Sequence, residues 1–257
     1  MSHLGDAGLL MRRSVVRLLR QPANIVFAFV FPLLLLAVNA GGLNAATRIP
    51  GFPSNTYVTF ALAVPFVQGA LFASNIAGTN VAQDIESGFL SRLALTPITR
   101  TALLAGQLAG VMALGVAQAV VYFAVGEAAG AGFKAGPGGV LVLLALAILT
   151  TLAFGSVGAF AAIRTGSGEA VQGLFPLFFV FLFLSSISLP RDLIQTDWFR
   201  TVATYNPVSY LLEGIRSLLI TGWDGKALAL GFACAAGVAV IALTACVLAL
   251  RTRVLRT

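Results

Sequence analysis

Six long apolar runs, separated by short polar segments, divide this chain of 257 residues. A helix needs about 20 mostly apolar residues to cross a bilayer, where every backbone N–H and C=O must be paired within the protein. The runs therefore predict an all-α integral membrane protein with six transmembrane helices. The predicted spans of this single domain, 1–257, are residues 25–42, 57–79, 101–125, 138–163, 170–189 and 226–250.

Charged residues are few and lie mostly at the ends of these runs. Only 10% of the residues are charged and 58% are hydrophobic, whereas a soluble domain carries about 25% charged residues. Membrane topology explains the net charge of +7, so no nucleic acid partner is expected. Six spans place both termini on one side, and most Lys and Arg residues fall there, which predicts that both termini are cytoplasmic.

Residues 4–20 predict an amphipathic helix that lies in the cytoplasmic interface of the membrane. Its apolar face consists of Met11, Val15 and Leu18. Its arginines are expected to meet anionic lipid head groups. These arginines are Arg12, Arg13, Arg17 and Arg20. The charged region of a signal anchor is the alternative interpretation, and it also places the N-terminus inside.

The polar segment between the second and third runs predicts a short surface helix over residues 84–97. Asp84 and Glu86 open it and Arg92 lies near its end, which suits the helix dipole. Its apolar face, spaced by four residues, consists of Ile85, Phe89 and Leu93. Pro97 ends the helix. Such a helix could be held by a partner on the cytoplasmic side, although a solvated loop with an incidental helix is the alternative.

Residues 190–225 carry too many charges to span the membrane. Asn206 and Pro207 break the segment into two halves, which predicts an outer re-entrant helical hairpin before the last span. Glu213 and Arg216 are three residues apart and are expected to pair. Interfacial aromatic residues would be Trp198, Tyr205, Tyr210 and Trp223. A plain amphipathic surface helix is the alternative.

The sequence lacks the usual motifs of catalysis, ATP binding and metal binding. There is no phosphate-binding loop, and the only histidine is His3. Cys234 and Cys246 are separated by about 18 Å along one helix, too far for a disulfide. The spans are nearly free of acidic residues, which argues against an ion-coupled carrier. If the chain transports a substrate, the energy must come from another chain.

Two motifs, in this order, resemble those of a known family. One is Glu86-Ser-Gly88-Phe-Leu90-Ser-Arg92-Leu-Ala-Leu-Thr-Pro97-Ile-Thr-Arg100, which is similar to a Glu-x-Gly-x-x-x-x-Leu-x-x-x-Pro element with different internal spacing. The other is Asn206-Pro207-Val-Ser-Tyr210 with Arg216. Together with the N-terminal helix and the six-span plan, they resemble type-2 ABC-transporter permeases of the bacterial drug-exporter kind, grouped with daunorubicin-resistance permeases.

The resemblance implies a permease in the bacterial cytoplasmic membrane that works by alternating access. Two permease subunits, identical or paralogous, would form the pore, and two ATPase subunits would bind ATP and Mg below them. This chain would bind no cofactor and have no catalytic residue of its own. Residues 84–97 would be the coupling helix that docks on the ATPase. Its contact residues would be Asp84, Ile85, Glu86, Gly88, Phe89, Arg92, Leu93 and Pro97.

Polar and aromatic residues within the spans are the candidates for a substrate path. They are Gln68, Asn75, Gln118, Tyr122, Phe175, Phe178 and Phe179. Amides at membrane depth should face other helices or a wet cavity. The abundance of phenylalanine favours a hydrophobic or amphipathic cargo, such as a drug, an antibiotic or a lipid-like molecule. A membrane scaffold or assembly protein that transports nothing is the alternative from another class.

Overall fold

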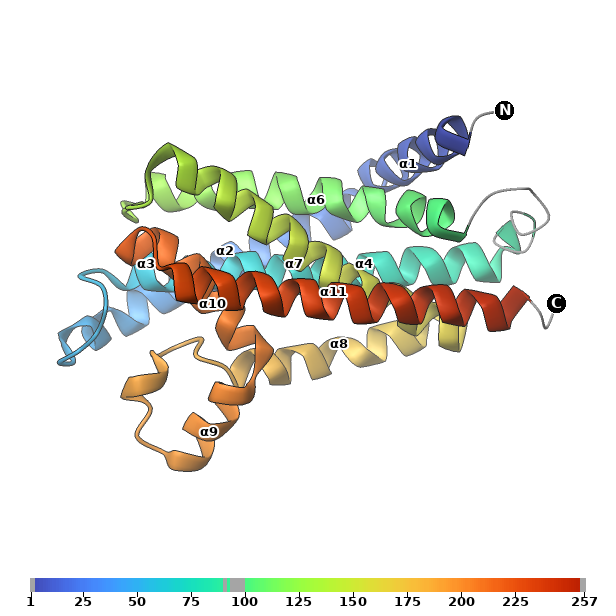
Figure 1. Ribbon diagram of the computed structural model, residues 1–257. Coiled ribbons are helices and arrows are strands. Elements are labelled where there is room, and N and C mark those ends of the chain that lie inside the picture. The colour runs from blue at the N-terminus through green and yellow to red at the C-terminus, as the bar shows by residue number, and fades with distance from the viewer. Residues whose placement is uncertain (1–2, 90–91, 93–99, 255–257) are drawn as a thin grey trace.

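The computed structural model describes residues 3–89, 92 and 100–254, which form a helical bundle that contains no strand (Figure 1). The prediction of an all-α integral membrane protein is confirmed. The longer helices are α1 (His3–Leu19), α2 (Pro22–Leu43), α4 (Ala63–Glu86), α6 (Arg100–Ala128), α7 (Gly136–Thr165), α8 (Gly168–Phe183) and α11 (Gly225–Val254). The shorter ones are α3 (Tyr57–Ala61), α9 (Asp197–Tyr205) and α10 (Pro207–Arg216), with single turns at Asn44–Arg48, Arg191–Leu193 and Ser217–Thr221.

Five helical segments among the described residues are long and apolar enough to cross a membrane. They are Pro22–Arg48, Tyr57–Glu86, Ala102–Ala128, Gly136–Thr165 and Gly225–Thr252. The fifth predicted span, 170–189, corresponds to α8, which has only 16 residues and ends before residue 189. At 1.5 Å per residue α8 is about 24 Å long, shorter than the hydrocarbon core of about 30 Å.

Helix α4 is the centre of the bundle. In the candidate span Tyr57–Glu86, which consists of α3 and α4, the most apolar stretch is 94% buried, whereas no other candidate span exceeds 44%. Helix α4 packs against α2, α6, α7 and α8. The closest approach is to α7, where a Cβ atom added to Gly158 would lie 2.0 Å from the Ser74 carbonyl oxygen. Small residues allow this contact, since hydrophobic burial does not drive helices together within lipid.

The second span begins at Tyr57 as predicted, but it is interrupted near its start and extends beyond its predicted end. It is divided between α3 and α4 at Leu62, because Pro65 has no N–H to donate to the carbonyl of Ala61. It then continues past residue 79 to Glu86. The polar residues of this extension find partners on other helices, so the chain has no need to leave the bundle there.

The break predicted at Asn206 is confirmed, and it separates α9 from α10. Asn206 caps α10 by accepting a hydrogen bond from the Val208 N–H, and Pro207 occupies the first helical position. The Asn206 amide also donates to the carbonyls of Phe181 and Leu184, just where α8 ends. One side chain therefore ends one helix and begins another.

The predicted ion pair between Glu213 and Arg216 is wrong. Glu213 pairs with Arg191 instead. Arg216 is buried and donates to the carbonyls of Phe60, Ser186 and Ile187 at 3.0, 2.5 and 2.7 Å. The Arg216 guanidinium therefore binds backbone carbonyls that are distant in the sequence, and not the carboxylate of Glu213 three residues before it.

Figure 1 shows how the ends of the bundle are composed. Helix α1, the C-terminal end of α4 and the C-terminal end of α11 lie at one end, which we call the α1 end. Helix α9 stands apart from the main bundle at the opposite end, below α10. Trp198 and Tyr205 of α9 are 63% and 82% exposed.

Candidate functional site

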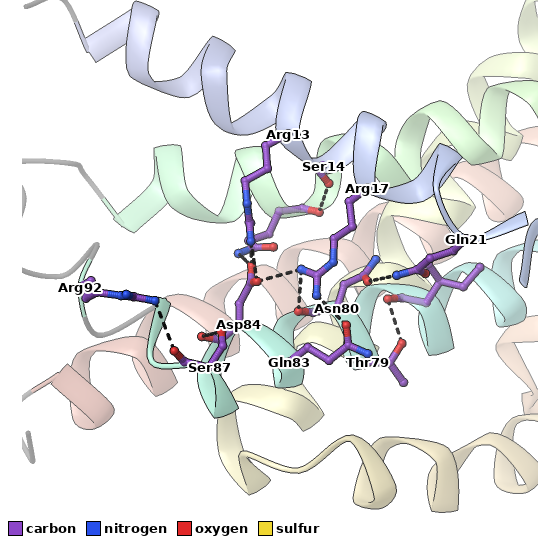
Figure 2. Close-up of polar contacts among 12 residues, drawn as sticks. Arg13, Ser14, Arg17, Gln21, Thr79, Asn80, Gln83, Asp84, Ser87 and Arg92 are labelled. Carbon is purple, nitrogen blue, oxygen red and sulfur yellow. Dashed lines mark hydrogen bonds and ion pairs between the residues drawn. The ribbon is translucent and has the colours of Figure 1, made fainter.

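Asp84 lies at the α1 end and is surrounded by side chains from two other helices (Figure 2). Arg13 of α1 binds it with two hydrogen bonds, Nη1 to Oδ2 at 2.9 Å and Nη2 to Oδ1 at 2.8 Å. Arg17 of α1 donates to Oδ1 at 2.8 Å, and Gln107 of α6 donates to Oδ2 at 2.6 Å. We call these four residues the Asp84 cluster.

The Asp84 cluster corrects two predictions. Asp84 does not open a new helix but belongs to the last turns of α4, where its side chain is only 2% exposed. Arg13 and Arg17 bind this carboxylate, although they were expected to face lipid head groups. The hydrogen bonds to Asp84 raise the pKa of the Arg13 guanidinium. A buried carboxylate requires such partners, because an unpaired one is costly.

Helix α1 is also held against α6 by close backbone contact. A Cβ atom added to Gly106 would lie 2.5 Å from Leu10 Cβ, and one added to Gly110 would lie 2.6 Å from Ser14 Oγ. Ser14 Oγ donates to the Gln107 carbonyl and accepts from the Gly110 N–H. The spacing of these two glycines is that of helix pairs whose backbones approach closely in membranes. Helix α1 is thus an integral part of the bundle.

A tight turn follows the Asp84 cluster at Ser87 and Gly88. Gly88 has a φ of +68°, a conformation that favours glycine. The turn brings the Phe89 ring under the Arg13 guanidinium, 3.9 Å from ring centroid to Cζ. Before the turn, Glu86 accepts a hydrogen bond from the Gly168 N–H at 3.2 Å, at the first turn of α8. The turn therefore contacts both α1 and α8.

The remaining predicted coupling residues differ in their surroundings. Ile85 is partly buried and packs against the apolar core beneath α1. Glu86 and Arg92 are exposed, and Arg92 donates to the Ser87 carbonyl. Leu93 and Pro97 lie outside the described residues.

Sequence reasoning missed several partners in this region. Arg17 also donates to the Gln83 side chain at 2.6 Å and to the Asn80 carbonyl at 3.2 Å. Gln21 donates to the Asn80 side chain at 3.3 Å. The available signal was the group of amide side chains that flanks Asp84 in the sequence, Asn80 and Gln83 before it and Gln107 near the start of the next apolar run.

Two of the predicted path residues have a structural role. Gln118 and Tyr122 are buried, and both donate to the carbonyl of Ala28 at 3.2 and 2.7 Å. This carbonyl has no helical donor, because Pro32 stands four residues further along α2. Gln68 is also buried. Gln118 and Tyr122 therefore satisfy the backbone carbonyl that Pro32 leaves without its helical donor.

Other predicted path residues line a pocket of about 430 Å³ between α2, α4 and α8. Its lining includes Phe27, Phe72, Asn75, Gln172, Phe175 and Pro176. Phe179 contacts this aromatic group through the rings of Phe72 and Phe175. Phe178 instead packs edge-on against Phe154 of α7, at 6.0 Å between centroids. The structure thus brings Asn75, Phe175 and Phe179 together and separates them from Phe178.

No group of His, Cys, Asp and Glu residues suitable for a metal ion occurs in the part of the chain that the structure describes. The helical bundle and its apolar spans define a multi-pass membrane protein. Residues 6–220 match the ABC-2 type transporter family, and the chain belongs to it. It is the membrane subunit of an ABC transporter, a family whose membership implies an ATPase partner on another chain.

Curated relatives agree with this family. The daunorubicin resistance ABC transporter permease protein DrrB1 of Streptomyces coeruleorubidus is 27% identical over 224 residues, which cover 85% of this chain and 74% of the relative. The putative transport permease ycf38 of Porphyra purpurea is 26% identical over 219 residues, covering 84% and 74%. The ycf38 protein of Pyropia yezoensis is 26% identical over 215 residues, covering 81% and 72%.

Proposed function

We propose that this chain is the permease of an ATP-driven exporter and that residues 84–97 dock on the ATPase. The observation that carries the proposal is the Asp84 cluster, which joins α1, α4 and α6 at the first residue of this segment. A displacement of the segment by the ATPase would move these helices together. Such a concerted movement is what alternating access requires.

The structure divides the proposed coupling residues into two groups. Asp84 and Ile85 are turned inward, so they would position the segment. Glu86 and Arg92 are exposed and would set the orientation of the partner through their charges. Phe89, Leu93 and Pro97 remain proposed contact residues, with Gly88 allowing the turn.

We assign the cargo to the pocket between α2, α4 and α8. Its rings offer apolar surface, and its amides, Asn24, Asn75 and Gln172, offer hydrogen bonds. Pro176 has no N–H, so the carbonyl of Gln172 lacks its helical donor and can accept a hydrogen bond from a ligand. This combination suits an amphipathic aromatic molecule with a donor group. The relative named for daunorubicin resistance supports a drug-like cargo.

The complete transporter would contain a second permease, identical or paralogous, and two ATPase subunits that bind ATP and Mg. Exposed apolar side chains on α2 and α8 suit lipid or a second permease. They include Val26, Phe27, Val30, Leu34, Leu177, Val180 and Phe183. The α1 end would face the cytoplasm of a bacterial cell, with both termini inside and the α9–α10 hairpin entering the outer leaflet.

Cysteine labelling tests the proposed docking and its orientation. Ser87→Cys, in a chain with Cys234 and Cys246 replaced by alanine, is expected to react with a membrane-impermeant maleimide in inside-out vesicles. Bound ATPase should protect it, since Ser87 is exposed within the docking segment. Asn55→Cys, in the exposed loop at the opposite end, is the matched control and should react only in intact cells. Labelling of Ser87→Cys from outside the cell would refute the proposal.

Transport by inside-out vesicles tests the cargo pocket. Phe175→Ala should reduce ATP-dependent daunorubicin uptake about tenfold, because ring contacts of about 1–1.5 kcal/mol are lost. Phe178→Ala is the matched control on the same helix, and it should retain uptake because its ring faces Phe154 instead. Equal losses in the two variants, at equal amounts of folded protein, would contradict this assignment.

A further inference from the structure

A second pocket, of about 590 Å³, lies between α1 and the end of α4. Its lining residues are Arg13, Val16, Arg17, Arg20, Gln21, Gln83, Asp84 and Ser87. It borders the Asp84 cluster, and Figure 2 shows Arg17 of α1 and Gln21, which directly precedes α2, reaching toward α4 there.

The charges of this pocket do not balance. Three arginines and a single carboxylate line it. Asp84 cannot neutralise a third guanidinium, because Arg13, Arg17 and Gln107 already occupy both of its oxygens. The pocket therefore has a surplus of positive charge, because the hydrogen-bonding positions of its single carboxylate are already taken.

Arg20 holds the unused hydrogen-bonding capacity. It is exposed, and its side chain forms no hydrogen bond or ion pair with the residues that the structure describes. Arg17 lies about one helical turn before Arg20, and its side chain is 21% exposed. A guanidinium presents donors in a planar fork that matches two oxygens of a phosphate.

The position of the pocket favours a lipid as the source of the phosphate. Helix α1 exposes apolar side chains next to these arginines, with Leu9 and Leu19 66% and 67% exposed. Helix α2, a candidate span, begins at Pro22, directly after Arg20 and Gln21. An amphipathic helix of this kind lies at the depth of the head groups. Anionic lipids concentrate phosphate at this depth.

We propose that this pocket binds the phosphate head group of an anionic phospholipid, with Arg20 as the principal ligand and Arg17 beside it. The lipid assignment rests on the proposed placement of the α1 end at the cytoplasmic membrane surface. It does not depend on export or on the ATPase. The bound lipid would rest against the Asp84 cluster and hold α1 in place.

Native mass spectrometry of the full chain in neutral detergent tests this site. With dioleoyl phosphatidylglycerol and dioleoyl phosphatidylcholine as probes, the wild type should retain one phosphatidylglycerol in preference to phosphatidylcholine. Arg20→Gln should weaken retention of phosphatidylglycerol about tenfold, as expected for a lost charge-assisted contact. Arg20→Lys should keep only part of it, because the charge is conserved but the planar fork is lost.

Arg12→Gln is the matched control. Arg12 is an exposed arginine of the same helix that does not line the pocket, so its loss should change retention less than twofold. Equal weakening by Arg12→Gln and Arg20→Gln would reduce the effect to general surface attraction and overturn the site. Equal retention of both lipids, or displacement of phosphatidylglycerol by millimolar inorganic phosphate, would overturn the lipid assignment. Each outcome can be read without any transport measurement, so failure here is distinguishable from failure of the proposed export function.

Discussion

Asp84→Asn is expected to release α1 from the bundle and to uncouple the transporter. The substitution leaves Arg13 and Arg17 without a counter-charge, while Gln107 loses a charged acceptor. Breaking a buried ion pair costs about 3–5 kcal/mol, and we expect the lower end because the two arginine side chains are 38% and 21% exposed. The measurements are the thermal unfolding midpoint in detergent and, in the complex, ATPase activity coupled to export.

The matched control for this change is Glu86→Gln. It makes the same chemical replacement two residues further on, at an exposed position whose carboxylate accepts a single hydrogen bond from Gly168. It should shift the unfolding midpoint much less. The double variant Asp84→Asn/Arg13→Gln should lose less stability than the sum of the losses in the two single variants, since both residues belong to one network. Wild-type stability and coupling in Asp84→Asn would refute the role given to this cluster.

Arg216→Met is expected to loosen the hairpin at the opposite end of the bundle. The carbonyls of Phe60, Ser186 and Ile187 would lose their donor, and each unsatisfied buried acceptor costs about 1–3 kcal/mol. The guanidinium also lies over the Phe60 ring, 3.6 Å from its centroid. We therefore expect a loss of about 3 kcal/mol or more and faster proteolysis between residues 190 and 205.

Arg200→Met is the matched control for this second change. Arg200 lies in α9, is 49% exposed and pairs with an exposed aspartate, so its removal should have little effect on stability. If the two variants unfolded at the same temperature and were cleaved at the same rate, Arg216 would not anchor the hairpin.

The helices were predictable where the signal is local. Apolar length predicted the long helices, and the Asn-Pro pair located the break between α9 and α10, because both depend on a few neighbouring residues. The end of α8 was misplaced by six residues, since it depends on Asn206 reaching back to the carbonyls of Phe181 and Leu184.

The candidate site was predictable only in part, because its geometry depends on distant partners. Asp84 matched the start of a surface helix, but its main ligand is Arg13, 71 residues away. Glu213 and Arg216 have the spacing of a helical ion pair, yet each binds groups that are distant in the sequence: Glu213 binds Arg191, and Arg216 binds backbone carbonyls. Gln118 and Tyr122 resembled path residues because the sequence could not reveal that Pro32, on another helix, had freed a carbonyl beside them.

The Asp84 cluster also constrains the order in which the protein can be assembled during synthesis. Helix α1 leaves the ribosome before α4 and α6, and Asp84 and Gln107 are made 71 residues and more after Arg13. The N-terminal arginines must therefore wait, solvated or bound to lipid phosphate, until α4 and the start of α6 have been inserted. Docking of α1 is then a late step, and it can occur only when both of those helices have entered the membrane in the correct direction.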